Sequence, residues 1–345
     1  MVNFILLCRK KTGNSHSKDG DIKIEPLTVL IACKNEAHRL ASLIKALENQ
    51  VASAAEIIIV DDNSTDSTLK VAQQLSAQGK VNISVLQNKG RGKKAAIRTG
   101  ILHTHTRWVI TTDADVVCPE TWLESMGRTI SENEDDQLGA IAGPVRIMNG
   151  GIESMDYAAM MGWAAGTSLN GKTAMASAAN LAFCVELYPR EEQMHPEIES
   201  GDDVFAVHAI IENGNKVYWS HDINSCVDTH KAGGLVNWLQ QRFRWGSKAK
   251  YYNHKSAFRT SIWVSFVATI QIFILILFLS GFASLTEITI LWFGRAFVDI
   301  IFTRQVTKWY RIRTSLVDWF LLSIVYPIQV PAVFIFGLIN KPKWK

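Results

Sequence analysis

Two stretches in the last third of the chain contain no charged residue, and each is long enough to cross a lipid bilayer. Thr260–Thr286 provides 27 such residues in succession, and Trp319–Asn340 provides 22. A membrane-spanning helix needs about 20 predominantly apolar residues. The whole-chain average of 48% apolar residues is ordinary for a soluble globular protein, but these two stretches predict an integral membrane protein. They also exclude a disordered chain and a small disulfide scaffold.

A further segment, Ile288–Phe302, is a weaker candidate span because it contains Arg295 and Asp299. These two residues are four apart and share a helix face, so they can pair inside a helical bundle. The basic loop that follows is expected in the cytoplasm, and a hairpin of the first two spans leaves the N-terminal domain there as well. The last stretch contains Pro327 and Pro331, so a full span and a broken or re-entrant hairpin both remain open.

Charge and cysteine usage narrow the function classes. The net charge of +4 is too small to indicate a nucleic-acid partner. The 5 cysteines are scattered and form no C-x-x-C pair, which argues against a zinc ribbon or a disulfide framework and fits a reducing compartment. Within Met1–Leu7, the apolar run Phe4-Ile5-Leu6-Leu7 is too short for the apolar region of a secretory signal and has basic residues after it, not before it. Met1–Leu7 is either an ordinary start or the end of an upstream span, and a longer reading frame would decide between them.

Short apolar runs alternate with segments of helical period through the first two thirds of the chain. The runs expected to form strands are Leu27–Cys33, Glu56–Val60, Val81–Leu86, Trp108–Thr112, Leu138–Val145 and Lys216–Ser220. Helices are expected between them, including one capped by Ser64-Thr65-Asp66 and others over Lys93–Leu102 and Pro119–Ile130. This alternation predicts βαβ units and a mainly parallel sheet, the α/β class.

The same pattern gives an expected domain organisation. Residues 1–25 are polar and form a flexible segment, and residues 26–233 form the α/β domain. Residues 234–256 are expected to form an amphipathic helix at the membrane interface, with packing on the soluble domain as the alternative. Residues 257–345 form a membrane region of two or three helical segments.

Carboxylates follow two of the expected strands. The second strand runs into Asp61-Asp62-Asn63-Ser64-Thr65-Asp66, and the fourth into Asp113-Ala114-Asp115. Ligands of open α/β sheets bind beyond the carboxyl ends of the strands. In an extended segment, Asp113 and Asp115 point the same way. Two convergent carboxylates favour Mg²⁺ or Mn²⁺, with positions left open for substrate phosphate oxygens.

A basic glycine turn lies between these two clusters. Gly90-x-Gly92-x-x-Ala95 formally matches the dinucleotide fingerprint, but it stands at the third βα turn and contains three basic residues. A turn of this kind that opens a helix suits a pyrophosphate group, and a solvated basic turn is the alternative.

Two later stretches also carry candidate residues. Glu199-Ser200-Gly201-Asp202-Asp203 is expected to open a helix, where the helix dipole favours a carboxylate. Gln241-Arg242-Phe243-Arg244-Trp245 combines amide, guanidinium and indole groups just before the membrane region. Arginine suits phosphate, and tryptophan offers a stacking face for a sugar.

Taken in order, these residues resemble the family 2 inverting glycosyltransferases, and the apolar tail looks like that of the polysaccharide-synthase branch. The resemblance covers about Leu27 to Trp245. The parts that carry it are Asn35-Glu36, Asp61 to Asp66, Gly92-Lys93, Asp113-Ala114-Asp115, Asn180, Gly201-Asp202-Asp203 and Gln241-x-x-Arg244-Trp245. Lys34 departs from the family, which often has an aromatic residue or Arg at that position.

The resemblance implies a Rossmann-like GT-A fold that uses a nucleotide diphosphate sugar, commonly UDP-linked. It implies that Asp203 is the general base and that Asp115 binds the metal, Mg²⁺ or Mn²⁺. It implies that Asp62 contacts the base and that Asp113 faces the donor sugar and ribose. The remaining residues implied in substrate binding are Asn35, Glu36, Lys93, Asn180, Gln241, Arg244 and Trp245.

The function expected is a membrane-anchored inverting glycosyltransferase with its catalytic domain in the cytoplasm. Its expected partners are a nucleotide-sugar donor, a glycan or lipid-linked acceptor, membrane lipid, and subunits of a synthase or export complex. Processive polymerisation and single transfer both remain open. The alternatives are a non-catalytic nucleotide-sugar-binding subunit of such a complex and, less favoured, an NAD-dependent membrane enzyme.

Overall fold

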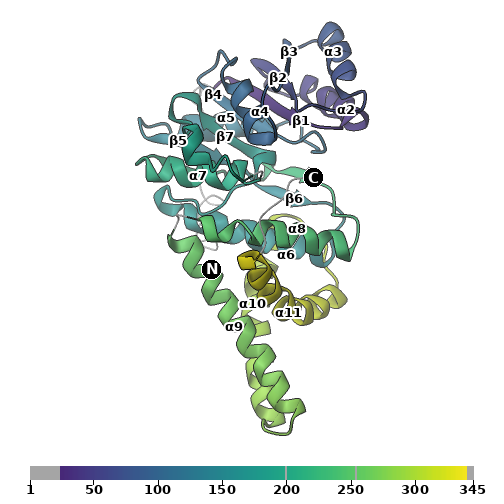
Figure 1. The fold of residues 1–345 in the computed structure, drawn as a ribbon, viewed down its shortest axis with the longest axis vertical. Helices are drawn as coiled ribbons and strands as arrows, with labels where there is room; N and C mark the ends of the chain where they lie inside the picture. Colours follow the sequence, from purple (N-terminus) through teal and green to yellow (C-terminus); the bar gives the residue numbers. More distant parts are fainter. Residues whose placement is uncertain (1–23, 199, 253–254, 340–345) are drawn as a thin grey trace, which may run out of the picture. The chain divides into compact units, whose positions relative to one another are not determined.

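A seven-stranded sheet forms the centre of the first two thirds of the chain, in the order β3-β2-β1-β4-β7-β5-β8. The computed structural model describes residues 24–198, 200–252 and 255–339. The strands of this sheet are β1 (Leu27–Cys33), β2 (Glu56–Asp61), β3 (Ile83–Gln87), β4 (Trp108–Thr112), β5 (Leu138–Ala142), β7 (Leu181–Cys184) and β8 (Lys216–Trp219). Figure 1 shows them side by side, coloured from purple to teal.

The chain divides into two compact units, each described here by itself. Among the described residues, the sheet unit contains those up to Arg146 and those of Trp163–His230, and the helical unit contains Ile147–Gly162 and those from Lys231 on. The expected boundary at residue 233 lies close to this division. The α/β domain expected over residues 26–233 also includes Ile147–Gly162, which belongs to the helical unit in the structure. The expected flexible segment lies almost wholly outside the described residues.

The prediction of a mainly parallel α/β sheet is confirmed. β1 pairs in parallel with β2 and β4, β2 with β3, and β5 with β8. β7 is antiparallel to both of its neighbours, β4 and β5. The sequence analysis missed β7 because its four residues stand alone between two short 3₁₀ turns and show no period.

Buried strands and amphipathic helices explain why this part of the chain folds as it does. All residues of β2 and β4 are buried, as expected for central strands covered on both faces. In α2 (Ala37–Glu48) the buried side chains are Leu40, Leu43, Ile44 and Leu47, one stripe at helical spacing. The other helices of the sheet unit are α3 (Thr68–Gln78), α4 (Lys93–Ile101), α5 (Trp122–Glu132) and α7 (Asp202–Glu212).

Two expected boundaries are corrected by the structure. The strand expected over Leu138–Val145 ends at Ala142, and β6 (Val145–Ile147) pairs instead with β9 (Val227–Thr229). Pro144 separates the two strands because it has no N–H for a ladder hydrogen bond. Helix α3 begins at Thr68 and not at Ser64, because Asp66 Oδ1 accepts a hydrogen bond from Thr68 N at 2.9 Å and turns the chain there.

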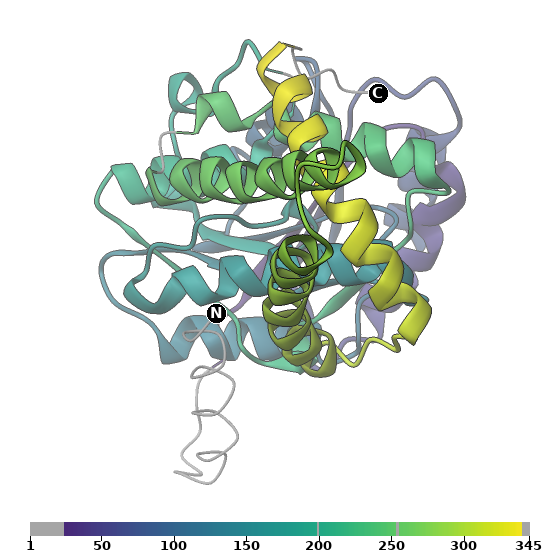
Figure 2. The same cartoon turned by 90° about the horizontal axis from the view of Figure 1, so that it is seen from below.

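The helical unit contains α8 (Leu235–Gly246), α9 (Lys255–Leu279), α10 (Leu285–Trp309), α11 (Leu316–Ile339) and most of α6 (Gly151–Thr167). The amphipathic helix expected over residues 234–256 ends at Gly246, and a 3₁₀ turn over Ala249–Tyr251 follows it. α11 packs on α8 and α9, and Figure 2 shows it in yellow crossing α9. At the α8 contact a side chain on Gly337 would meet Gly246 O at 2.6 Å, so these backbones approach closely.

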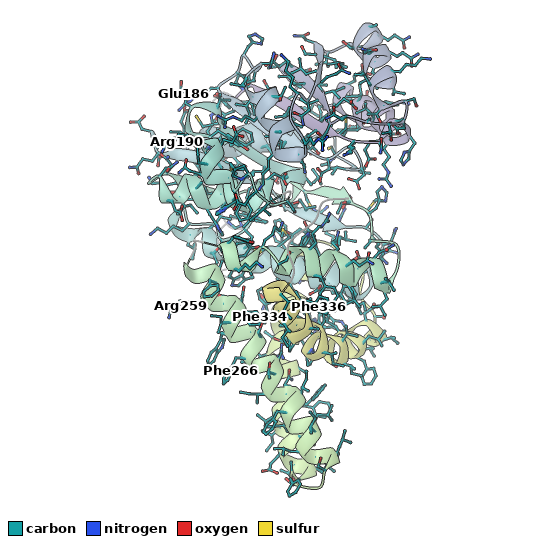
Figure 3. All side chains as sticks on the ribbon, in the orientation of Figure 1. Glu186, Arg190, Arg259, Phe266, Phe334 and Phe336 are labelled. Atoms are coloured by element: carbon teal, nitrogen blue, oxygen red, sulfur yellow. The ribbon has the colours of Figure 1, made fainter. Side chains whose placement is uncertain are left out.

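Two helices in the described residues are long and apolar enough to cross a membrane, Ala257–Leu279 and Leu316–Gly337. They correspond to the two uncharged stretches, whereas α10, with its internal charges, does not meet the same criteria. α11 is one continuous helix that includes Pro327 and Pro331, so the alternative of a re-entrant hairpin is not observed. Exposed aromatic side chains such as Phe266 stand out from α9, as Figure 3 shows.

The expected pairing of Arg295 and Asp299 is confirmed. Arg295 Nε lies 3.1 Å from Asp299 Oδ2. Arg295 also hydrogen-bonds Gln271 of α9 and lies over the ring of Tyr326 of α11, 4.9 Å from its centroid. One guanidinium group therefore connects all three long helices through polar and cation–π contacts, which compensates the cost of a charge among apolar side chains.

The free cysteines of the sheet unit are expected to resist alkylation in the native protein. Burial raises the pKa of Cys33, Cys118 and Cys226 to about 12. At pH 8 only about one in 10⁴ of such thiols is the reactive thiolate. Iodoacetamide treatment followed by peptide mass spectrometry should leave these three unmodified in native protein and modify them in denaturant. Modification of native Cys118 at the rate of a free peptide would contradict this expectation.

Candidate active site

The strand order places a topological switch point between β1 and β4. From β1 the chain moves outward through β2 and β3, and then β4 pairs on the other side of β1. In doubly wound folds, ligands bind in the crevice at the carboxyl ends of the strands at such a point. Asn35 and Glu36 follow β1, and Asp113 and Asp115 follow β4, so the expected site residues lie at this edge.

Asn35 joins the loops that follow β1 and β2. It adopts a left-handed conformation with φ of 58°, which Asn tolerates better than most residues. Its Oδ1 accepts a hydrogen bond from Thr65 N at 2.8 Å, and its own N donates to Ser64 Oγ at 3.0 Å. Glu36 N donates to Thr68 Oγ1 at 2.8 Å in the same way. The structure thus gives Asn35 a loop-organising role at the site, and its expected contact with substrate remains a prediction.

Asp62 shapes the basic glycine turn. Its carboxylate is buried and accepts hydrogen bonds from Asn88 Nδ2 at 2.6 Å and from Gly92 N at 3.0 Å. Gly92 has a φ of 84°, which favours glycine, and it immediately precedes α4. The sequence analysis did not assign a role to Asn88, although its position directly after β3 at the same sheet edge was a usable signal. The expected contact of Asp62 with a nucleotide base remains a prediction.

Lys93 lies between two carboxylates. Its Nζ is 2.5 Å from Asp113 Oδ1 and 3.2 Å from Asp202 Oδ2, and its side chain is only 10% exposed. Burial alone lowers the pKa of Lys93, but the Asp113 and Asp202 carboxylates outweigh it and hold that pKa above its ordinary value. The ammonium group is therefore neutralised inside the protein. It joins the residue after β4 to the start of α7, and its expected contact with substrate remains a prediction.

Arg39, which the sequence analysis missed, connects the two sides of the switch point. Its Nη1 lies 3.3 Å from Glu36 Oε2 and 3.7 Å from Asp115 Oδ2. Burial raises the pKa of Glu36, and Arg39 opposes that rise. The signal for Arg39 was its place three residues after Glu36 at the start of α2, where the two side chains share a helix face.

The residues present fit a hard divalent cation. β4 ends at Thr112 and the chain turns at Ala114, so Asp113 and Asp115 are not on an extended strand as expected. Both carboxylates remain partly exposed at the sheet edge, at 38% and 32% of their side-chain surface. The described residues contain no cluster of three or more ligand side chains. One or two carboxylates suffice for Mg²⁺ when substrate phosphates supply the other oxygens.

The Gly201-Asp202-Asp203 element opens α7 as expected. Gly201 is the N-cap with a φ of 92°, and Asp202 is buried against Lys93. Asp203 is half-buried, and its Oδ1 accepts a hydrogen bond from Val204 N at 2.7 Å. Adjacent carboxylates thus have different surroundings. Asp202 is committed to an internal ion pair, and Asp203 is the more accessible of the two. Glu199, which precedes them, lies outside the described residues.

Asn180 has a structural environment. It is fully buried, and its Oδ1 accepts a hydrogen bond from Trp122 Nε1 at 2.9 Å. Its Nδ2 donates to Pro144 O at 2.9 Å and to Ser225 O at 2.8 Å. A side chain on Gly143 would collide with this amide. These contacts satisfy both ends of the Asn180 amide within the protein, which favours a scaffold role over the expected substrate contact.

Gln241, Arg244 and Trp245 lie on α8 in the helical unit. The ring centroids of Trp245 and Tyr157 are 5.7 Å apart. The guanidinium group of Arg242 lies over the Trp245 ring, 4.6 Å from its centroid. Gln241 Oε1 is buried and has no hydrogen-bond partner among the described residues. A buried amide oxygen of this kind is costly unless something else pairs with it, which is consistent with the predicted binding role.

Comparisons with known proteins indicate a family for the first part of the chain. The model of the family described as glycosyl transferase family 2 matches residues 28–166. Glycosyltransferase AglE of Haloferax volcanii is 27% identical over 230 residues, covering 64% of this chain and 71% of that protein. Poly-beta-1,6-N-acetyl-D-glucosamine synthase of Staphylococcus aureus is 29% identical over 160 residues. That match covers 43% of this chain and only 37% of the synthase.

A solved structure shares the fold. The mannosyltransferase PcManGT from Pyrobaculum calidifontis, in complex with GDP-Man and Mn²⁺, aligns with a TM-score of 0.53 at 16% identity. The alignment covers 98% of this chain and 94% of that one. Together with the family match and the strand order, this likeness supports the GT-A fold. Residues 28–166 therefore form a domain that matches glycosyltransferase family 2.

Proposed function

We propose that this glycosyltransferase moves a sugar from a nucleotide diphosphate sugar to an acceptor hydroxyl with inversion at the anomeric carbon. The observation that carries the proposal is the meeting of Asp113, Lys93 and Asp202 at the carboxyl edge of the sheet, beside the start of α7. Lys93 thus links the turn after β4 to Asp202, the neighbour of Asp203 in the chain, which supports a proposed metal-binding turn and a proposed base at one edge of the sheet.

Each residue has a proposed role that follows from its surroundings. Asp62 and Gly92 fix the turn that opens α4, whose N-terminus favours an anionic group. Asp115 and Asp113 are the proposed holders of Mg²⁺ or Mn²⁺, which supplies charge stabilisation for the leaving diphosphate. Asp203 takes the proton of the acceptor hydroxyl as that oxygen attacks. Arg244 is proposed to contact the diphosphate and Trp245 the acceptor sugar.

The relatives bear on the donor and the acceptor. The synthase of S. aureus is named for a product of N-acetylglucosamine, and PcManGT was solved with GDP-Man and Mn²⁺. The two names differ in sugar, so the proposed donor is a UDP- or GDP-linked hexose or N-acetylhexosamine. The proposed acceptor is a growing glycan or a lipid-linked sugar.

Membrane anchorage is part of the proposal. α9 and α11 carry the two apolar segments, and exposed side chains such as Trp263, Phe266 and Phe273 cover α9. The stretch between α10 and α11 contains Arg311 and Arg313, which the positive-inside rule favours on the cytoplasmic side. With α9 and α10 proposed to cross as the hairpin expected from the sequence, the sheet unit is proposed to lie on the cytoplasmic side as well.

Nucleotide release tests the function directly. Purified protein in detergent, given UDP- and GDP-linked sugars one at a time, should release UDP or GDP from at least one of them. Release should require Mn²⁺ or Mg²⁺ and should stop with EDTA, because the proposed carboxylates act through the metal. Product length on a gel then separates single transfer from polymerisation. Nucleotide binding without any release would favour the alternative of a non-catalytic binding subunit.

A further inference from the structure

Three backbone carbonyls surround the ammonium group of Lys94, the second residue of α4. Lys94 Nζ donates to Met194 O at 2.7 Å, to His195 O at 3.0 Å and to Ile198 O at 2.7 Å. An ammonium group has three N–H donors, so these acceptors match its full capacity. A surface lysine ordinarily keeps its head group in water, whereas Lys94 is half-buried and turned onto the backbone. The contact joins residues about a hundred positions apart in the chain.

The segment that Lys94 holds includes a strained residue. His195 has a φ of 51°, a left-handed conformation that few non-glycine residues adopt. Its ring lies 4.6 Å from that of Phe205 in α7, and Lys94 Nζ lies 4.7 Å from the centroid of the same Phe205 ring. Lys94 thus holds the carbonyl group of His195, and Phe205 packs against its ring. Strained backbone persists only where its surroundings hold it in place.

The two lysines that begin α4 contact both ends of the segment leading into α7. Lys94 binds Met194 to Ile198, and Lys93 lies 3.2 Å from Asp202, the first residue of α7. The preceding residue, Gly92, is fixed by its hydrogen bond to Asp62 at 3.0 Å. A continuous set of contacts therefore runs from the residue after β2, through the start of α4, to the residue next to Asp203.

We propose that Lys94 is a positioning residue that fixes the Met194–Ile198 segment and, through it, the place of the Asp203 carboxylate. The inference rests on the proposed function, in which Asp203 is the general base. A displacement of about 1 Å in a reacting group can lower a rate by about 100-fold. Lys94 itself contacts backbone atoms and has no part in the proposed chemistry.

Lys94→Met tests this role because it keeps the length of the side chain and removes the charge and the donors. We expect kcat for nucleotide release to fall about 10- to 100-fold. The affinity for UDP or GDP with Mn²⁺ should stay within about twofold, since Asp62, Asn88 and Gly92 keep their contacts. Lys94→Arg, which keeps a cation and several donors, should recover part of the loss. Hydrogen exchange of residues 194–198 should become faster in Lys94→Met.

Lys216→Met is the matched control. Lys216 Nζ lies 2.5 Å from Asp135 Oδ2 on the surface of the same unit, so the same substitution removes an ion pair that includes no residue of α7 or of the Met194–Ile198 segment. It should leave kcat and the exchange of residues 194–198 unchanged. Phe205→Leu removes the ring that Lys94 and His195 share and should move both measurements in the direction of Lys94→Met. It serves as the test if Lys94→Met does not fold.

Two results would overturn the proposal. One is unchanged exchange of residues 194–198 in Lys94→Met, and the other is faster exchange with wild-type kcat. If the wild-type protein neither binds nor hydrolyses any nucleotide sugar, the proposed function fails. Comparing hydrogen exchange of residues 194–198 between Lys94→Met and Lys216→Met still decides whether Lys94 holds this segment.

Discussion

Replacing Asp203 with Asn is expected to lower the turnover of nucleotide sugar by about 10²- to 10⁴-fold, the usual contribution of a general base. Asn keeps the size of the side chain and can still accept the hydrogen bond from Val204 N. It cannot take a proton from the acceptor. The affinity for the nucleotide with Mn²⁺ should remain near that of the wild type, because Asp62, Asp113 and Asp115 are unchanged. Nucleotide release and thermal shift by UDP or GDP measure the two quantities separately.

Asp136→Asn is a matched control for that experiment. Asp136 is an exposed residue shortly before β5, so the same chemical change there should alter neither turnover nor binding. Turnover undiminished in Asp203→Asn would remove Asp203 from the mechanism. Asp202→Asn is a different experiment, because it breaks the ion pair with Lys93 and is expected to disturb α7.

A large loss of stability is expected when a buried ion pair of the helical unit is broken. Arg242 Nη2 lies 2.6 Å from Asp156 Oδ2, and the two side chains are only 7% and 11% exposed. The Gln329 side chain of α11 also hydrogen-bonds Asp156. The pair therefore connects α6, α8 and α11. Arg242→Met should lower the free energy of unfolding by about 3–5 kcal/mol, since it leaves a buried carboxylate without its counter-charge.

The pH dependence of this variant follows from Asp156. Burial raises the pKa of Asp156, and Arg242 opposes that rise. Without Arg242 the native-state pKa lies further above the unfolded value, so the native state binds a proton more tightly than the unfolded state does. The variant's stability deficit is then largest at high pH and shrinks as the pH falls and Asp156 is protonated. Thermal unfolding in detergent at pH 5 and pH 8 measures this difference.

Two further variants make that test specific. The double variant Asp156→Leu/Arg242→Met should recover most of the lost stability, because an apolar pair replaces an ionic one. Arg128→Met removes an exposed ion pair with Glu124 and should cost at most about 1 kcal/mol. A deficit in Arg242→Met no greater than that of Arg128→Met would show that the buried pair contributes little.

Local sequence patterns predicted the elements of the fold that depend on near neighbours. The continuous apolar runs became β1, β2 and β4, and the period of 3.6 residues gave the stripe of Leu40, Leu43, Ile44 and Leu47. The positions of Asp62, Asp113 and Asp203 followed as well, because each stands directly after a predicted strand or at a predicted helix start. The short β7 was missed because four residues carry too little period.

What each side chain contacts was not predictable in the same way. Lys93 was expected to contact substrate, and the structure adds that its ammonium group lies between Asp113 and Asp202, which are far from it in sequence. Asn180 was expected to contact substrate and instead satisfies Trp122, Pro144 and Ser225. In both cases the partners come together only when the sheet forms, since no spacing in the chain relates them.

The sequence by itself determined that this chain has two uncharged stretches long enough to cross a bilayer, an α/β domain before them, and acidic and basic clusters at the strand ends. It did so because length, composition and period are properties of contiguous residues. Only the tertiary structure decided that Arg39 joins Glu36 to Asp115, that Lys94 holds the segment before α7, and that Arg242 pairs with Asp156. Those choices depend on which distant side chains packing brings within a few ångströms, and on the cost of leaving a buried charge unpaired.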